Sequence, residues 1–310
     1  FSSILCGLSN EKFLLFLGLS LLGLSCSIYH PVGIAWVVNS SDKKGRALGI
    51  NGIFGGIGIG SGAFIAGLLI KYFDWKVAFI LPGIVSIFVG IILFIFIINK
   101  HISFQNIKSE NLHHSNSSND LILIASIMLF SMFALGLTFQ IMQTSIPKVF
   151  DIRIQNLSTF AIGAIIGAIY GIAGLMTLVG GIMADKFSLK KIYVIGIAAQ
   201  VPCFFCIAYF TGLPLIIVCL IAAMFNSSIL PTENILLAKF TPEKHHGLIY
   251  GFKFIIAFGS APIAVFLISK IYEQTHEFTN LFYITTTLMI LVTFAVLFLP
   301  INNEKLNFPN

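Results

Sequence analysis

Long apolar blocks alternate with short polar stretches along almost the whole chain. Each block runs for about 20 residues or more, which is the length an α-helix needs to cross roughly 30 Å of hydrocarbon. Residues 1–9 form a shorter apolar stretch that resembles the tail of a further span. The pattern therefore predicts an all-α, polytopic transmembrane helical bundle. Its nine full spans are predicted at residues 13–39, 46–70, 77–98, 121–147, 157–182, 192–211, 213–238, 247–269 and 279–300.

One long polar stretch interrupts this alternation. Residues 99–120, NKHISFQNIKSENLHHSNSSND, are rich in Asn, Ser and His, a composition typical of flexible linkers. We expect a cytoplasmic linker there, between a partial N-terminal bundle over 1–98 and a C-terminal bundle of six spans over 121–310. His113 and His114 are potential metal ligands, but a solvated loop is the favoured interpretation. No metal or cofactor is expected.

Composition and charge fit the same class of protein. Only 10% of the 310 residues are charged and 57% are hydrophobic, whereas an average soluble domain is about 25% charged. The net charge of +6 comes mainly from short loops, which favours membrane topology over a nucleic-acid partner. Alternate loops hold eleven basic residues on one side and six on the other. The linker and the C-terminus are therefore predicted to face the cytoplasm, with the protein embedded in the lipid bilayer of the cell (inner) membrane.

An internal repeat is visible at an offset of about 200 residues. GRALGINGIF from Gly45 pairs with GLIYGFKFII from Gly247, and SIYHP from Ser27 pairs with SSILPTEN from Ser227. This mapping places the first two full spans on the fourth and fifth spans of the second half. It predicts a twelve-helix molecule of which this chain lacks two helices and most of a third.

Three motifs stand out from the apolar background. The loop GGIMADKFSLKK joins the fifth and sixth full spans, the second span carries spaced glycines, and YHPVGIAW, GRALGINGIFGG and DWKVAF follow one another near the N-terminus. Together they resemble the major facilitator superfamily of secondary transporters, and the third set is similar to its fosmidomycin-resistance-type branch. The loop departs at Ser188 and Leu189 from the family's G-x-x-x-D-[RK]-x-G-[RK]-[RK] pattern. It matches that pattern at Gly181, Asp185, Lys186 and Lys190.

The resemblance implies two six-helix halves, with the first two to three helices missing, and transport of a small molecule by alternating access. We expect a monomer. The branch implies efflux, but Ala63 and Ala66 replace a proline and a glycine of the family's fifth-helix motif, which disfavours a drug antiporter specifically. Import stays open. The glycines that match the motif are Gly49, Gly58, Gly62 and Gly67.

Elementary electrostatics and packing suggest roles for the first two motifs. Asp185 lies just past a predicted helix end, where its carboxylate can meet a neighbouring helix N-terminus, whose dipole favours anions. With Lys186 and Lys190 it would form a charged latch at the cytoplasmic surface. The alternative is a solvated loop that only sets topology. The glycines offer a smooth face on which two helices can approach closely.

Three ionisable residues lie inside predicted spans, where such residues are costly and usually functional. Glu233 and Lys253 lie at equal depth, about 10 Å from the cytoplasmic boundary, on consecutive antiparallel helices. We expect them to form an ion pair, or to release each other alternately, facing the central cavity. A static pair that only holds two helices together, or snorkelling of the side chains to the surface, is the alternative.

The third residue, His30, lies about 13 Å inside the boundary and precedes Pro31, which removes a backbone donor and kinks a helix. Broken helices are tolerated where they line a cavity, and histidine titrates near neutral pH. We therefore expect His30 to bind substrate or to take part in proton coupling. A neutral histidine bonded to a neighbouring helix is the alternative. Further candidates for the substrate or proton pathway are Tyr29, Asn51, Gln140, Gln143 and Asn226, the last beside a helix break predicted at Pro231.

The leading function is secondary transport, with proton coupling through His30 and Glu233. A primary pump is disfavoured, because the chain has no G-x-x-x-x-G-K-[ST] loop. An intramembrane enzyme is disfavoured too, because H-E-x-x-H and G-x-S-x-G do not occur. A non-transporting receptor or scaffold on the same fold stays open.

Overall fold

The computed structural model of the chain describes residues 1–100, 118–242 and 245–300. Most of the predicted linker, with His113 and His114, lies outside the described residues. Within those ranges the regular structure is helical, and nine stretches are long and apolar enough to cross a membrane. The predicted all-α transmembrane bundle is confirmed.

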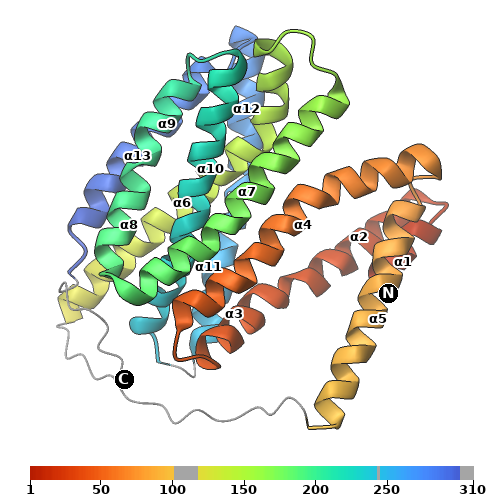
Figure 1. Cartoon of the computed structure of the whole chain (residues 1–310), viewed down its shortest axis with the longest axis horizontal. Helices are drawn as coiled ribbons and strands as arrows, with labels where there is room; N and C mark the ends of the chain where they lie inside the picture. The colour runs from red at the N-terminus through yellow and green to blue at the C-terminus, as the bar shows by residue number, and fades with distance from the viewer. Residues whose placement is uncertain (101–117, 243–244, 301–310) are drawn as a thin grey trace.

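Among the described residues, five helices precede the linker and eight follow it (Figure 1). The N-terminal group consists of α1 (Ser2–Leu8), α2 (Lys12–Ser27), α3 (Tyr29–Asn39), α4 (Lys44–Tyr72) and α5 (Val77–Ile98). The C-terminal group consists of α6 (Ser118–Arg153), α7 (Thr159–Lys186), α8 (Leu189–Ala198), α9 (Gln200–Ile207), α10 (Gly212–Lys239), α11 (His246–Gly259), α12 (Ala261–Thr275) and α13 (Thr279–Leu297).

Three of the spans are divided into two helices, each time just before a proline. The break between α2 and α3 falls at Ile28, and Pro31 follows it within the next turn. A proline has no N–H to donate to the carbonyl one turn back, so the helical ladder is interrupted. The breaks at Ala199 and at Ser260 precede prolines in the same way.

By contrast, α10 carries Pro231 in its interior and remains one helix, so the break predicted there is wrong. A transmembrane helix tolerates a proline where neighbouring protein packs around the freed backbone groups. The neighbour here is α7, which packs so closely that the Ser228 backbone leaves no room for a side chain at Gly180.

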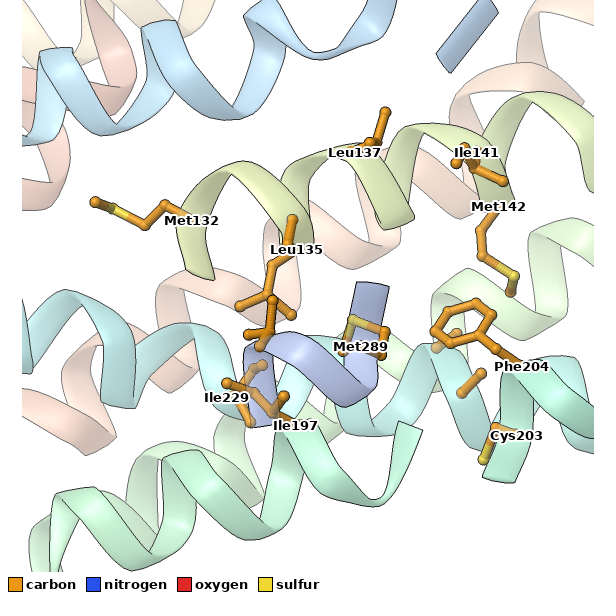
Figure 2. Close-up of a cluster of buried hydrophobic side chains, with 14 of the residues drawn as sticks. Met132, Leu135, Leu137, Ile141, Met142, Ile197, Cys203, Phe204, Ile229 and Met289 are labelled. Carbon is orange, nitrogen blue, oxygen red and sulfur yellow. The ribbon is translucent and has the colours of Figure 1, made fainter. Parts of the chain in front are cut away.

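The most extensive buried core lies inside the C-terminal group. Figure 2 shows a cluster of buried apolar side chains between α6, α8, α9, α10 and α13. Lipid tails are as apolar as these side chains, so close packing and dispersion contacts stabilise the cluster. Its labelled members are Met132, Leu135, Leu137, Ile141, Met142, Ile197, Cys203, Phe204, Ile229 and Met289.

Two helix pairs make the main contacts between the groups, and α4 also contacts α10. The helix α4 runs antiparallel to α7, since Gly45 lies beside Gly181 and Gly60 lies beside Gly167. The helix α3 packs against α11.

The helix α2 precedes α3 in one span, and α12 follows α11 in another. The helices α2 and α12 lie apart (Figure 1). The α3–α11 contact lies at the end with the basic loops, and α2 and α12 separate toward the opposite end. The α4–α7 contact continues further, to the rings of Phe64 and Phe160, whose centroids lie 6.1 Å apart.

Candidate functional site

The two charged residues predicted on consecutive helices form a buried ion pair. Lys253 Nζ on α11 lies 2.5 Å from Glu233 Oε1 on α10. Only 2% of Glu233 and 4% of Lys253 is exposed. The expectation that the pair faces an open cavity is therefore wrong for this structure, because side chains of the surrounding helices enclose both charges.

Each charge has a further hydrogen-bond partner. The Tyr193 hydroxyl on α8 lies 2.9 Å from Glu233 Oε2 and 2.9 Å from Ser131 Oγ on α6. Lys253 Nζ donates to Asn234 Oδ1 at 2.7 Å. These five residues of α6, α8, α10 and α11 form one polar cluster, which we call the charge centre.

The charge centre is stable only while both charges are satisfied. Desolvation costs several kcal/mol per ion, and close pairing with additional hydrogen bonds offsets that cost. Removal of one partner leaves an uncompensated buried charge, which typically destabilises a protein by about 3–5 kcal/mol. Protonation of Glu233 would release Lys253 from the pair, so this arrangement has the chemistry to couple a proton to a rearrangement.

His30 lies at the contact between α3 and α11, next to the charge centre. Its ring stacks on Phe254 with the centroids 4.1 Å apart and lies 5.7 Å from the Phe258 centroid. The Lys253 ammonium lies 5.6 Å from the centroid of the same Phe254 ring. One aromatic ring therefore links the histidine of the N-terminal group to the charge centre of the C-terminal group.

Other side chains complete the contact around His30. A side chain at Gly251 on α11 would meet Pro31 at 3.7 Å, so the two helices approach closely there. The Tyr29 hydroxyl donates to Asn51 Oδ1 on α4 at 2.6 Å, and the Tyr29 side chain remains exposed. Tyr29 and Asn51 are thus fixed to each other beside His30.

A polar contact between α11 and α3, made by His246 and Asn39, was not predicted from the sequence. His246 at the start of α11 is buried, and its Nδ1 lies 3.1 Å from Asn39 Oδ1 at the end of α3. Its Nε2 lies 3.2 Å from the Ala238 carbonyl and 3.0 Å from the Thr241 carbonyl. Because carbonyls only accept, Nε2 carries a proton. The role of Nδ1 toward Asn39 then depends on the protonation of the ring and on the orientation of the Asn39 amide.

Asp185 contacts the N-terminus of α4. Its Oδ1 accepts from the Gly45 N–H at 2.7 Å, and its Oδ2 accepts from the Arg46 N–H at 2.8 Å. These donors have no partner inside the helix, and the helix dipole favours a carboxylate at this end. Gly181, one turn before Asp185, packs directly on Gly45 with no room for a side chain. The geometry of a latch is present, and its role in transport stays a prediction.

The two lysines predicted to belong to this latch have other surroundings. Lys190 Nζ donates to the Leu299 carbonyl at 2.7 Å, just past the end of α13. A cation is favoured at a helix C-terminus, so Lys190 supports α13 in this structure, and its part in a latch stays a prediction. Lys186 lines a cavity between α4 and α7.

The glycines that bring α4 and α7 together differ in part from the predicted set. Gly49 packs against α7, but a Cβ added at Gly58, Gly62 or Gly67 would meet nothing within 4 Å. The packing role predicted for these three is wrong in this structure, because they lie on another face of α4. The glycines of α4 that contact α7 are Gly45, Gly49, Gly52, Gly56 and Gly60.

The three amide candidates lie on α6 and α10. Asn226 Nδ2 donates to Gln200 Oε1 at 3.3 Å and lines a cavity of about 10 Å³, which suits roughly one water molecule. The Tyr170 hydroxyl, buried beside the same cavity, has no hydrogen-bond partner among the described residues. Gln140 is half-buried and Gln143 is exposed. Asn226 therefore points into the C-terminal group.

At the opposite end of the molecule, Arg153 ties together three helices of the C-terminal group. It pairs with Glu277 in the α12–α13 loop, and its Nη1 donates to the Ile207 carbonyl at the end of α9 at 2.6 Å. The hydrogen bond from Arg153 is the main cause that lowers the pKa of the Glu277 carboxyl below its ordinary value. We call Arg153, Ile207 and Glu277 the outer clamp.

Comparisons with known proteins place this arrangement among transporters. The family model for the Major Facilitator Superfamily matches residues 1–176 and 121–310. The riboflavin transporter RibZ of Clostridioides difficile (strain 630) is 35% identical over 94 residues, which span 29% of this chain and only 21% of RibZ. The crystal structure of the E. coli fucose:proton symporter FucP matches with a TM-score of 0.73 at 14% identity, covering 97% of this chain and 82% of FucP. Because the family model matches the chain throughout, the chain belongs to the major facilitator superfamily.

Proposed function

We propose that the chain acts as a secondary transporter that moves a small molecule across the cell (inner) membrane by alternating access. The main support is the unequal contact between the helix groups, since α3 packs on α11 while α2 and α12 diverge. A carrier of this type closes one end around a site near the midplane and opens the other. The excess of basic loop residues assigns the closed end to the cytoplasm, with the linker and the C-terminus on that side. The structure then corresponds to an outward-open state.

Opening of the cytoplasmic end requires α3 to move away from α11. That movement breaks the stack of His30 on Phe254 and the contact of His246 with Asn39, both of which are made by side chains and can re-form. The Asp185 carboxylate must release the first N–H groups of α4 at the same time. These three contacts are therefore the cytoplasmic gate.

We place the substrate beside Tyr29, His30 and Asn51, at the upper edge of this gate. The aromatic rings there favour a substrate with a planar ring, because ring faces stack. RibZ is named as a riboflavin transporter, and riboflavin is a planar aromatic compound, so riboflavin is the first compound to test. The resemblance to the fosmidomycin-resistance-type branch favours efflux.

Proton coupling in this proposal uses the charge centre. Glu233 would carry the proton, Lys253 would serve as its counter-ion, and Tyr193 would hold the carboxylate in place. Separation of α3 from α11 would remove His30 from the Phe254 ring that lies against Lys253. The state of the gate and the protonation of Glu233 would thereby influence each other.

Counterflow in proteoliposomes tests the transport function. Vesicles loaded with unlabelled riboflavin should accumulate labelled riboflavin through the protein, and His30→Ala should lower the initial rate by about tenfold or more. Val32→Ala, an exposed position on the same helix, is the matched control and should keep the wild-type rate. Absence of exchange with riboflavin and with a panel of other aromatic solutes would contradict the proposal.

A pair of single variants and their combination test the coupling. Glu233→Gln and Lys253→Met should each lose stability, because each leaves one buried charge alone. The double variant should fold and still exchange substrate, but its rate should no longer depend on pH. A double variant with wild-type rate and pH dependence would show that the pair is only structural.

A further inference from the structure

A cavity of about 660 Å³ lies between α4 and α7, at the end that carries the basic loops. Both helix groups form its wall. The lining residues are Asp42, Lys43, Arg46 and Ile50 from the N-terminal group, and Leu178, Ile182, Asp185 and Lys186 from α7.

The charged part of this wall is predominantly basic. Lys43, Arg46 and Lys186 bring three cations to it, against the carboxylates of Asp42 and Asp185. The Asp185 carboxylate is already engaged by two backbone N–H groups of α4. In the part of the chain that the structure describes, none of the three cations forms an ion pair. The three cations are therefore opposed mainly by one carboxylate, that of Asp42, because the Asp185 carboxylate is bound to backbone N–H groups.

The remainder of the wall is apolar, which distinguishes this cavity from a site for a free ion. Ile50, Leu178 and Ile182 line it below the charged residues. Lys43 directly precedes the first residue of the α4 span, and Lys186 is the last residue of the α7 span. The cavity thus lies at the level of the membrane where phospholipid headgroups end and acyl chains begin.

We propose that this cavity binds the phosphate headgroup of an anionic phospholipid. Arg46 offers a planar guanidinium that matches phosphate oxygens bidentately, and the two lysines add point charges. Basic pockets between transmembrane helices on the cytoplasmic side recognise such headgroups, and the apolar wall accepts the first part of an acyl chain. This site is separate from the proposed substrate site and does not depend on which solute is transported.

The bound lipid links the two helix groups. Lys43 and Arg46 belong to the N-terminal group and Lys186 to α7, so a phosphate held by all three bridges α4 and α7 beside the Asp185 contact. A ligand shifts an equilibrium toward the state it binds more tightly. Anionic lipid therefore favours the arrangement in which the cytoplasmic end is closed.

Native mass spectrometry of the protein released from nanodiscs tests the site. Nanodiscs of phosphatidylcholine with phosphatidylglycerol should leave the wild-type protein with retained phosphatidylglycerol. Lys43→Gln, Arg46→Gln and Lys186→Gln should each reduce that retention by about fivefold, the usual worth of one cation near an anionic headgroup. Lys191→Gln, in the first turn of α8 and outside the cavity, is the matched control and should retain the wild-type amount.

Asp42→Asn tests the site by a change that should strengthen lipid binding. It removes the remaining carboxylate, so retention of phosphatidylglycerol should rise above the wild-type level. Equal retention in the wild type and in the triple Lys43→Gln, Arg46→Gln, Lys186→Gln variant would overturn the proposal. Displacement of the lipid by inorganic phosphate or glycerol 3-phosphate at equal concentration would also overturn it, because the cavity would then be a site for a soluble anion.

Discussion

The two main contacts between the helix groups are made by different parts of the residues. The contact of α4 with α7 is made at its middle by backbone, since Gly56 and Gly174 pack against each other without room for a side chain. The contact of α3 with α11 is made by side chains, with His30 stacked on Phe254 and His246 beside Asn39. Backbone contacts of this kind are rigid and hard to replace, whereas stacked rings and single hydrogen bonds separate and re-form.

This difference suggests that the two contacts have different roles in transport. A carrier that closes each end in turn needs one contact that persists and one that opens. The glycines in the middle of α4, Gly52, Gly56 and Gly60, suit the persistent contact with α7 and would act as a hinge, while the end of the same helix pair at the Asp185 contact opens with the gate. The side chains of α3 and α11 suit the contact that opens. The variants that follow test these roles, starting with the largest expected effect.

Gly56→Val should have the largest effect, because its new side chain would collide with the backbone of Gly174. Overpacking of this kind typically costs about 1–3 kcal/mol, and backbone on both sides leaves little room to relax. Thermal unfolding in detergent should show a clearly lower midpoint and a poor yield of folded protein. Gly58→Val, two residues further on the same helix, meets nothing within 4 Å and should unfold like the wild type. Equal loss in both variants would contradict the hinge.

Asp185→Asn should have the second largest effect, because it removes a charge from two backbone donors at the start of α4. We expect a loss of about 1–2 kcal/mol from the closed arrangement. Hydrogen–deuterium exchange at Gly45 and Arg46 should become faster, while Asp74→Asn, at an exposed position just past the other end of α4, should leave it unchanged. Unchanged exchange in Asp185→Asn would show that the carboxylate does not hold this end closed.

Phe254→Leu should weaken the α3–α11 contact without unfolding the protein. A stacked aromatic pair contributes about 0.5–1.5 kcal/mol beyond its buried area, and leucine keeps most of the volume. The variant should populate the open cytoplasmic end more often, which can be read as faster labelling of a cysteine introduced at Gly251. Phe252→Leu, exposed on the same helix, is the control. Slower labelling in Phe254→Leu would contradict the assignment of this contact to the gate.

Glu277→Gln, in the outer clamp, should have the smallest effect on stability, and it should leave the gate unaffected. The pKa of Glu277 is lowered in the folded protein, so its stabilisation is fully present above the ordinary value of 4.5 and is lost as the pH falls through the lowered value. Glu277→Gln should therefore unfold at a lower temperature than the wild type at neutral pH, and the difference should vanish in acid. Labelling at Gly251 should stay unchanged. A stability difference that grows toward acid would contradict the ion pair.

The number and the position of the spans could be predicted from the sequence, because a helix in lipid must satisfy its own backbone and needs a fixed apolar length. The partnership of Glu233 with Lys253 could be predicted for a similar reason. Two charges at equal depth on consecutive antiparallel helices have few other partners. Depth alone did not reveal that the pair is enclosed, because enclosure depends on Tyr193, which lies on a third helix.

The packing faces could not be predicted in the same way. The helix α4 carries glycines on more than one face, and spacing cannot say which face meets α7. Gly58 and Gly62 fit the family spacing, while Gly52 and Gly56 make the contact. Lys190 has the spacing of a latch residue, but its long side chain reaches the end of α13. His246 was missed because it lies at a helix end, where a loop histidine and a buried one look alike in sequence.

Pulsed electron–electron distance measurements in nanodiscs test the central claim most directly. One pair of labels would be placed at exposed positions on α3 and α11, Val32 and Leu248, and a second pair on α4 and α7, Phe54 and Leu175. We predict that transported substrate changes the populations of the first distance between a short and a long value, while the second distance keeps a single value. A change of equal size in both distances, or a first distance that stays single while the protein transports substrate, would contradict the account.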